Sequence, residues 1–174
     1  MIASFATILI TASSLPPHWN LQGHRAVVTG GSKGLGRAIV EELLKQGCEV
    51  LTCARDVSPL RELAAQEPRC VAVQADVSTA AGRAALKQAL ARRFGPRLDI
   101  LVNNAGLNTT GSYKGPTTTK QGYEICMGTN CFGHFALTAL LMPALRASPD
   151  ARVVALSSVT TWFASNKYQF YVKG

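Results

Sequence analysis

The segment that most constrains the fold is residues 26–40, which read AVVTGGSKGLGRAIV. Its first three residues are apolar and predict a buried strand, and a helical pattern opens at Arg37. Between them Thr29 to Gly36 spell T-G-x-x-x-G-x-G. Glycine lets the backbone turn tightly and lets a pyrophosphate approach it, and a helix start offers free N–H groups. The segment therefore predicts a dinucleotide-binding turn, with an ordinary strand-to-helix loop as the alternative.

Short apolar strands and helical patterns alternate along the rest of the chain. Strands are predicted at 27–29, 49–54, 69–74, 99–103 and 152–157, and helices at 35–46, 58–67, 78–94 and 120–147. We expect Ser78 to cap the third helix and Pro143 to kink the fourth. This alternation predicts an α/β fold, a doubly wound parallel sheet of Rossmann-like type with ligands at the carboxyl ends of its strands. We expect one such domain over residues 21–174, lacking its C-terminal strands.

The composition favours a globular protein, and the net charge indicates which class of ligand it would bind. The 174 residues are 47% hydrophobic and 16% charged, which excludes a disordered chain. The net charge of +8 favours anionic small ligands, and because the basic residues are scattered, we expect a solvated basic face and no nucleic-acid partner. A nucleic-acid-binding protein is the alternative from another class. Five cysteines without a C-x-x-C pair and three scattered histidines predict free buried thiols and no metal site.

Residues 1–20 form an apolar N-terminal extension. The first fifteen side chains carry no charge, the apolar run is too short to span a bilayer, and no basic region precedes it. We expect a cytoplasmic protein, with targeting or membrane contact by the extension as the alternative.

The end of the second predicted strand indicates which nicotinamide cofactor the turn would take. An acidic residue there would bind the ribose 2′-hydroxyl of NAD, but the sequence reads T-C-A-R, and the first carboxylate is Asp56. Arg55 and Lys33 could together bind a 2′-phosphate. These residues favour NADP(H) over NAD, unless both are plain surface charges.

Further motifs follow the glycine turn in a fixed order. Asp76-Val77 follows the third predicted strand, Asn103-Asn104-Ala105-Gly106 the fourth, Asn130 lies in an N-x-x-G-x-F context, and Ser157-Ser158 ends the fifth strand. Together with the T-G-x-x-x-G-x-G turn, this set resembles the classical short-chain dehydrogenase/reductase family from Leu21 onward. The first part looks like tropinone-reductase-like members and the middle part like retinol-dehydrogenase-like members.

The resemblance implies an oxidoreductase that interconverts a carbonyl and an alcohol by hydride transfer with NADP(H). Asp76 would accept a hydrogen bond from the adenine amino group, and the turn at 103–106 would pass close to the adenine ribose. The alternatives are that Asp76 only caps a strand end and that the asparagines only stabilise their turn. The implied cofactor-binding residues are Thr29, Gly30, Ser32, Lys33, Gly34, Leu35, Gly36, Arg55, Asp76, Val77, Asn104, Ala105 and Gly106.

The catalytic residues that the resemblance implies are Asn130, Ser158 and Tyr171, with Tyr168 as a less well spaced alternative to Tyr171. The tyrosine would give a proton to the carbonyl, the serine would polarise it, and the asparagine would anchor a water relay. In the family a lysine four residues beyond the tyrosine lowers its pKa. That position would be 175, one beyond Gly174, so a C-terminally truncated, catalytically inactive NADP(H)-binding module is the alternative function.

The expected partners are a small-molecule carbonyl or alcohol and, as a further option, a second copy of the chain. The last predicted strand and the long helix would leave apolar surface uncovered, which indicates an association site.

Overall fold

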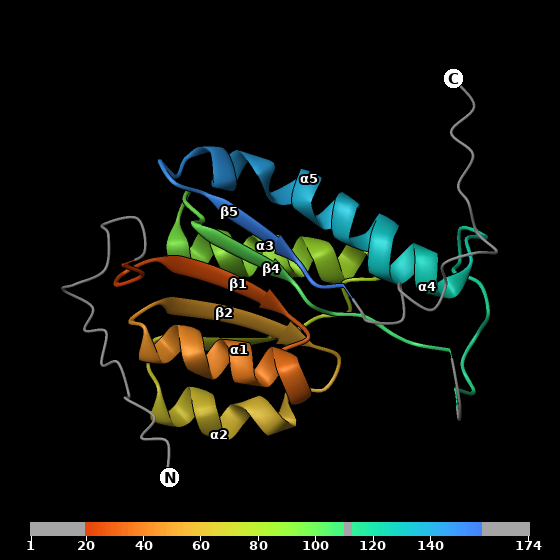
Figure 1. The fold of residues 1–174 in the computed structure, drawn as a ribbon, viewed down its shortest axis with the longest axis horizontal. Helices are drawn as coiled ribbons and strands as arrows, with labels where there is room; N and C mark the ends of the chain where they lie inside the picture. Colours follow the sequence, from red (N-terminus) through yellow and green to blue (C-terminus); the bar gives the residue numbers. More distant parts are fainter. Residues whose placement is uncertain (1–19, 110–112, 158–174) are drawn as a thin grey trace, which may run out of the picture.

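The computed structural model describes residues 20–109 and 113–157, which form a parallel sheet covered by helices on both faces (Figure 1). The sheet order is β3-β2-β1-β4-β5, so the chain starts in the middle and is wound outward in both directions. The strands are β1 (Arg25–Thr29), β2 (Glu49–Ala54), β3 (Cys70–Gln74), β4 (Ile100–Asn103) and β5 (Arg152–Ala155). This order confirms the predicted doubly wound α/β fold of Rossmann-like type.

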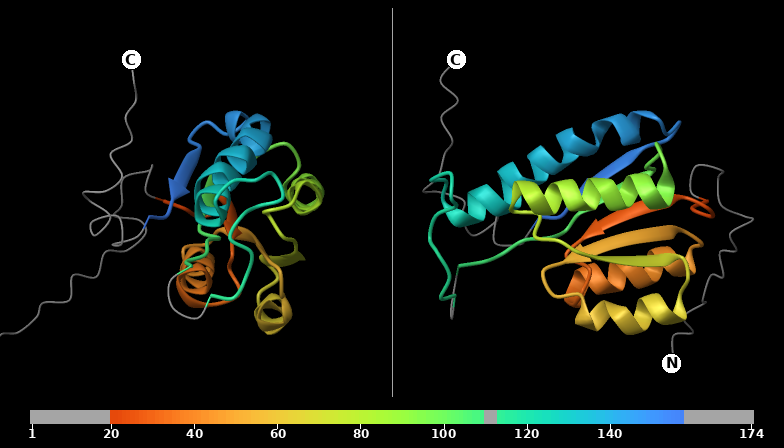
Figure 2. Two further views of the ribbon diagram at one scale, coloured as in Figure 1. Left: turned by 90° about the vertical axis from the view of Figure 1, so that its right-hand side faces the viewer. Right: turned by 180° about the vertical axis from the view of Figure 1, so that it is seen from behind.

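Alternate residues of the central strands point into two separate apolar layers. Val28 and Val50 pack with α1 (Gly34–Lys45) and α2 (Ser58–Gln66) on one face. Val27 and Leu101 pack with α3 (Ala80–Phe94) and α5 (His134–Arg146) on the other. The end-on view in Figure 2 shows these two helix pairs on opposite sides of the sheet. Because both faces of β1, β2 and β4 are covered, these strands read as continuous apolar runs.

The predicted elements of the first hundred residues lie within a few residues of the observed ones, with one error at a helix cap. Thr79, and not Ser78, is the N-cap of α3, and its Oγ1 accepts a hydrogen bond from the Gly82 amide at 3.0 Å. The Ser78 amide instead donates to Asp76 Oδ1 at 3.0 Å. The Asp76 side chain therefore forms a turn that shifts the helix start by one residue.

The predicted long helix at 120–147 is shorter and is not uniform. It runs through α4 (Ile125–Met127), the π-helical segment η3 (Gly128–Gly133) and α5. It begins late because the Glu124 carboxylate accepts hydrogen bonds from the amides of Cys126 (2.8 Å) and Met127 (2.7 Å), which caps the helix there. Pro143 lies inside α5, whereas the change in helix geometry lies earlier, in η3.

By length and composition alone, the span Ile125–Arg146 is apolar enough to cross a membrane. In the fold it lies beside the sheet, with Leu137, Leu141 and Leu145 buried in the core. A core helix passes the same test of length and composition, so this span carries little weight for a membrane assignment.

The outer parts of α5 and β5 leave apolar side chains exposed, as the sequence predicted. Phe135 is 76% exposed, and Val153 and Val154 on the edge strand are 46% and 44% exposed. Exposed apolar groups next to an open strand edge are a known route to association.

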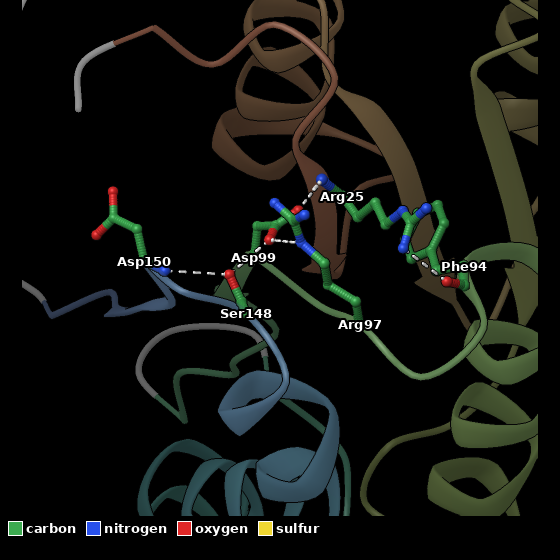
Figure 3. Close-up of polar contacts among 6 residues, drawn as sticks. All are labelled: Arg25, Phe94, Arg97, Asp99, Ser148 and Asp150. Carbon is green, nitrogen blue, oxygen red and sulfur yellow. Dashed lines mark hydrogen bonds and ion pairs between the residues drawn. The ribbon is translucent and has the colours of Figure 1, made fainter. Parts of the chain in front are cut away.

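A buried carboxylate joins three segments at the amino end of the sheet, opposite the site described below (Figure 3). Asp99 is fully buried and accepts hydrogen bonds from the Arg25 amide (2.9 Å), Arg97 Nε (2.5 Å) and Ser148 Oγ (2.6 Å). Burial alone would raise the pKa of this carboxyl, but the bonds from Ser148, Arg25 and Arg97 outweigh it and hold the pKa below its usual value. Asp99 thus ties the start of β1 and of β4 to the loop before β5.

Candidate cofactor-binding site

The predicted cofactor residues gather at the carboxyl edge of the sheet, where β1, β2 and β4 end side by side. The parallel register pairs Thr29 with Cys53 and Val28 with Val102. The loops that follow these three strands therefore start next to one another. This is the edge at which open α/β sheets bind their ligands.

The glycine turn after β1 has the geometry that its sequence predicted. Gly30 has a φ of +71°, which side chains rarely tolerate, and its amide donates to the Cys53 carbonyl at 2.8 Å. At Gly36 a Cβ would lie 2.3 Å from both the Gly30 carbonyl oxygen and Asn104 Nδ2. These two glycines let α1 begin directly against the turn and against the loop after β4.

The first turn of α1 offers backbone N–H groups to an anion. The Lys33 side chain at the N-cap position makes no capping hydrogen bond, and the first turn holds no acidic residue. Gly34 and Leu35 are exposed there, and Ser32 is half-buried. Uncapped amides at the positive end of a helix dipole fit a pyrophosphate, so this cradle suits the cofactor that the sequence predicted.

Thr29 and Asn104 lock the turn after β4 onto the end of β1. Thr29 is fully buried, and its Oγ1 accepts hydrogen bonds from the amides of Asn104 (3.0 Å) and Ala105 (2.9 Å). Asn104 Nδ2 in turn donates to the carbonyl oxygens of Thr29 (2.7 Å) and Gly30 (3.2 Å). Both side chains thus stabilise the two turns, and for Asn104 this is the turn-stabilising alternative that the sequence left open.

Asn130 and His134 hold the same loop from the helix on the far side. Asn130 Oδ1 accepts from the Leu107 amide (2.9 Å), and its Nδ2 donates to the Leu107 carbonyl (2.8 Å). His134 Nε2 lies 2.6 Å from the Ala105 carbonyl oxygen. The sequence predicted a role for Asn130 but none for His134, because only the fold brings these residues together. Gly106 lies exposed between the two anchors.

The two predicted phosphate-binding cations flank the glycine turn. Lys33 and Arg55 are exposed, and within the described part of the chain neither forms an ion pair. Asp56, the first carboxylate after β2, accepts from the Ser58 amide at 2.9 Å, and this bond lowers its pKa. Asp56 thus holds the start of α2 through one of its two carboxylate oxygens.

Asp76 follows β3 and is half-buried. Its Oδ1 carries the bond from the Ser78 amide, and its carbonyl oxygen accepts from Thr79 Oγ1 at 2.9 Å. Val77 is half-buried, and its carbonyl oxygen accepts from Arg83 Nη1 at 2.9 Å. The capping role that the sequence offered as an alternative for Asp76 is thus present, and no described residue donates to the second carboxylate oxygen.

Ser158 and Tyr171, the other predicted catalytic residues, lie outside the described residues, as does Tyr168. Among the described residues no group of three or more histidine, cysteine, aspartate or glutamate side chains could hold a metal ion.

Comparison with known proteins points to the same family as the motifs. The family model described as short chain dehydrogenase matches residues 24–172. A tropinone reductase homolog of Arabidopsis thaliana is 42% identical over 146 residues, which cover 81% of this chain and 53% of that protein. This chain therefore spans about half the length of the curated relatives it matches.

Solved structures of similar proteins share the fold of this chain. An NADP active-site complex of RhlG from Pseudomonas aeruginosa superimposes with a TM-score of 0.66 at 38% identity, covering 80% of this chain and 56% of that one. A 3-ketoacyl-(acyl-carrier-protein) reductase from Brucella melitensis, complexed with NADH, gives 0.62 at 29% identity, covering 73% and 52%. With the family match over most of the sequence and the motifs in place around one sheet edge, the chain belongs to the short-chain dehydrogenase family.

Proposed function

We propose that this chain binds NADP(H) at the carboxyl edge of its sheet and serves the interconversion of a small carbonyl compound and an alcohol. The observation that carries the proposal is the glycine turn backed by Thr29 and Asn104, with the uncapped start of α1 beside it. Two of the similar solved structures support a nicotinamide cofactor, since one is a complex with NADP and the other a complex with NADH.

The preference for NADP(H) rests on charge at the end of β2. Arg55 follows the last residue of β2, and the Gly30 amide binds the Cys53 carbonyl, so Arg55 starts its loop next to the glycine turn. Lys33 lies on that turn. Two exposed cations favour a 2′-phosphate, and the first carboxylate after β2, Asp56, comes one residue after Arg55 and accepts the Ser58 amide through one oxygen.

The expected contacts to the adenine and its ribose follow from where Asp76 and the loop after β4 lie. Asp76, with one carboxylate oxygen left, would accept a hydrogen bond from the adenine amino group, with the Val77 amide beside it. The exposed Gly106 and the backbone of Asn104 and Ala105 would lie along the adenine ribose.

Hydride transfer is the chemistry that the nicotinamide supplies when bound. Ser158 would polarise the substrate carbonyl, and Tyr171 would give or take the proton at its oxygen. Asn130 binds Leu107 with both ends of its amide, which leaves one proton on Nδ2 and one lone pair on Oδ1 for a water. Asn130 therefore holds the loop and can still anchor a proton relay.

The test of cofactor choice is titration of the purified chain with NADPH and with NADH, followed by the fluorescence of the reduced nicotinamide. We expect tighter binding of NADPH, and we expect Lys33→Ala with Arg55→Ala to remove most of the difference while NADH binding is unchanged. Lys87→Ala is the matched control, because Lys87 is exposed on α3 on the opposite face of the sheet from α1. Equal affinity for the two nucleotides in the wild type would refute the NADP(H) preference.

The test of turnover is oxidation of NADPH in the presence of a panel of ketones and aldehydes. Turnover that Tyr171→Phe abolishes supports the enzyme. Tight NADPH binding without turnover by any substrate would instead favour the inactive binding module.

As parts of the same proposal, the chain is cytoplasmic and self-associates through the exposed apolar groups of α5 and β5. A fluorescent fusion tests the location. Light scattering of Phe135→Ser against the wild type tests self-association, with a mass unaffected by the substitution as the contrary result.

A further inference from the structure

Side chains of β1 and of the helix formed by η3 and α5 hold the backbone of the loop after β4. Thr29 Oγ1 binds the amides of Asn104 and Ala105, and the Asn130 amide binds both polar groups of Leu107. The Ala105 carbonyl is the remaining anchor, and His134 Nε2 lies 2.6 Å from it. Ala105 is thus held from the sheet through its N–H and from a helix through its C=O.

Ala105 also packs directly against the glycine turn. A Cβ on Gly30 would lie 3.0 Å from the Ala105 Cα and 3.3 Å from its Cβ. A Cβ at position 30 would therefore require one of the two turns to shift. The Ala105 backbone thus lies close against the turn that would carry the pyrophosphate.

The helix presents His134 to this loop through its change of geometry. Asn130 lies in the π-helical segment η3, and His134 is the first residue of α5. Both side chains reach the same loop, Asn130 at Leu107 and His134 two residues earlier at Ala105. Because π-helical turns add a residue to the helix repeat, η3 sets the register in which both residues meet the loop.

A carbonyl oxygen has no proton to give, so His134 Nε2 must carry the hydrogen in this contact. We propose that His134 is a positioning residue of the cofactor site, whose Nε2–H holds the Ala105 carbonyl and so keeps the loop after β4 against the glycine turn. This inference rests on the proposed function in one respect: its effect on nucleotide affinity presupposes that the glycine turn binds a nucleotide.

Two substitutions of His134 test whether its N–H donor is what matters. In His134→Gln the side-chain amide can supply an N–H near the position of Nε2, whereas His134→Leu fills similar space without a donor. One neutral hydrogen bond corresponds to a factor of about three to ten in a binding constant. We therefore expect His134→Leu to weaken NADPH binding by roughly that factor, and His134→Gln to bind as the wild type does. His24→Leu, at the amino end of β1, is the matched control.

Two measurements on the full chain decide the proposal. The first is the ¹⁵N imidazole spectrum, in which the three histidines are assigned by their variants. We expect His134 to show a slowly exchanging Nε2–H, and an Nδ1–H tautomer would overturn the proposal. The second is NADPH titration of the variants. An affinity of His134→Leu equal to that of the wild type, or a loss that His134→Gln shares, would also overturn it.

If the wild-type chain binds neither NADPH nor NADH, the proposed function is refuted, but the positioning role of His134 is still open to test. Hydrogen exchange at the Asn104 and Ala105 amides then tests that role. Exchange at least several-fold faster in His134→Leu than in His134→Gln and wild type supports the positioning role, and equal exchange in all three refutes it.

Discussion

Replacing Thr29 by valine removes the hydroxyl that joins the glycine turn to the loop after β4 and keeps nearly the same side-chain volume. Thr29 is fully buried, and its Oγ1 accepts from the Asn104 and Ala105 amides at 3.0 and 2.9 Å. The valine would leave both amides without this acceptor. The Asn104 amide keeps a second acceptor, the Val102 carbonyl at 3.1 Å, so the loss of its bond to Thr29 costs about 1 kcal/mol. The Ala105 amide loses the acceptor described for it, at a cost of about 1–3 kcal/mol, so we expect Thr29→Val to lower the free energy of unfolding by about 2–4 kcal/mol.

The assay is urea unfolding followed by circular dichroism, with two comparison variants. Thr29→Ser keeps the acceptor and loses only a methyl group, so it should cost about 1 kcal/mol. Thr52→Val removes an equally buried hydroxyl that donates to the Val28 carbonyl at 2.9 Å and accepts from none of the described amides. It should cost about 1 kcal/mol as well.

The reasoning about Thr29 also predicts a local effect. Hydrogen exchange at the Asn104 and Ala105 amides should speed up in Thr29→Val and stay near the wild-type rate in Thr52→Val. If Thr29→Val and Thr52→Val lowered the free energy of unfolding equally, the stabilising role of the two hydrogen bonds that Thr29 accepts would be refuted.

Three further outcomes follow from the geometry. Gly36→Ala should cost about 1–3 kcal/mol in urea unfolding, because its Cβ would lie 2.3 Å from the Gly30 carbonyl oxygen; a cost no larger than that of an ordinary helix substitution would contradict the close approach. Asp99 has a pKa held below its usual value, so its contribution to stability is full above about pH 4 and is lost as the pH falls through the lower folded value. Acid titration of the unfolding midpoint should therefore be flatter in Asp99→Asn, and an unchanged acid profile would count against this carboxylate. Burial raises the pKa of the Cys53 thiol to about 11, so at pH 8 iodoacetamide should label the exposed Cys131 and spare Cys53, as peptide mass spectrometry can show.

The local features of the site could be predicted from sequence because each depends on neighbouring residues. The glycine spacing of 29–36 requires backbone that only glycine adopts or allows, and Gly30 and Gly36 show those two needs in the structure. The apolar runs mark strands buried on both faces, and their alternation with helices leaves few sheet topologies. The helix cap at Thr79 was missed, because Ser78 and Thr79 offer the same chemistry and the Asp76 turn decides between them.

The geometry of the long helix and the contacts between distant segments could not be predicted from motif spacing and apolar periodicity. The long helix was expected over 120–147 with a kink at Pro143, but Glu124 caps it late and its geometry changes in η3. Nothing in the spacing of His134 indicates a partner at Ala105, 29 residues away.

The sequence by itself determined the fold class, the glycine turn and the identity of the residues at the strand ends, since local backbone chemistry and burial periodicity specify these. Only the tertiary structure decided what Thr29, Asn104, Asn130 and His134 bind. Thr29 and Asn104 are joined across 75 residues. The bonds between Thr29 and Asn104 require β1 and β4 to pair, because their parallel register brings the ends of the two strands to one edge of the sheet. The bonds of Asn130 and His134 also require α5 to pack on the sheet.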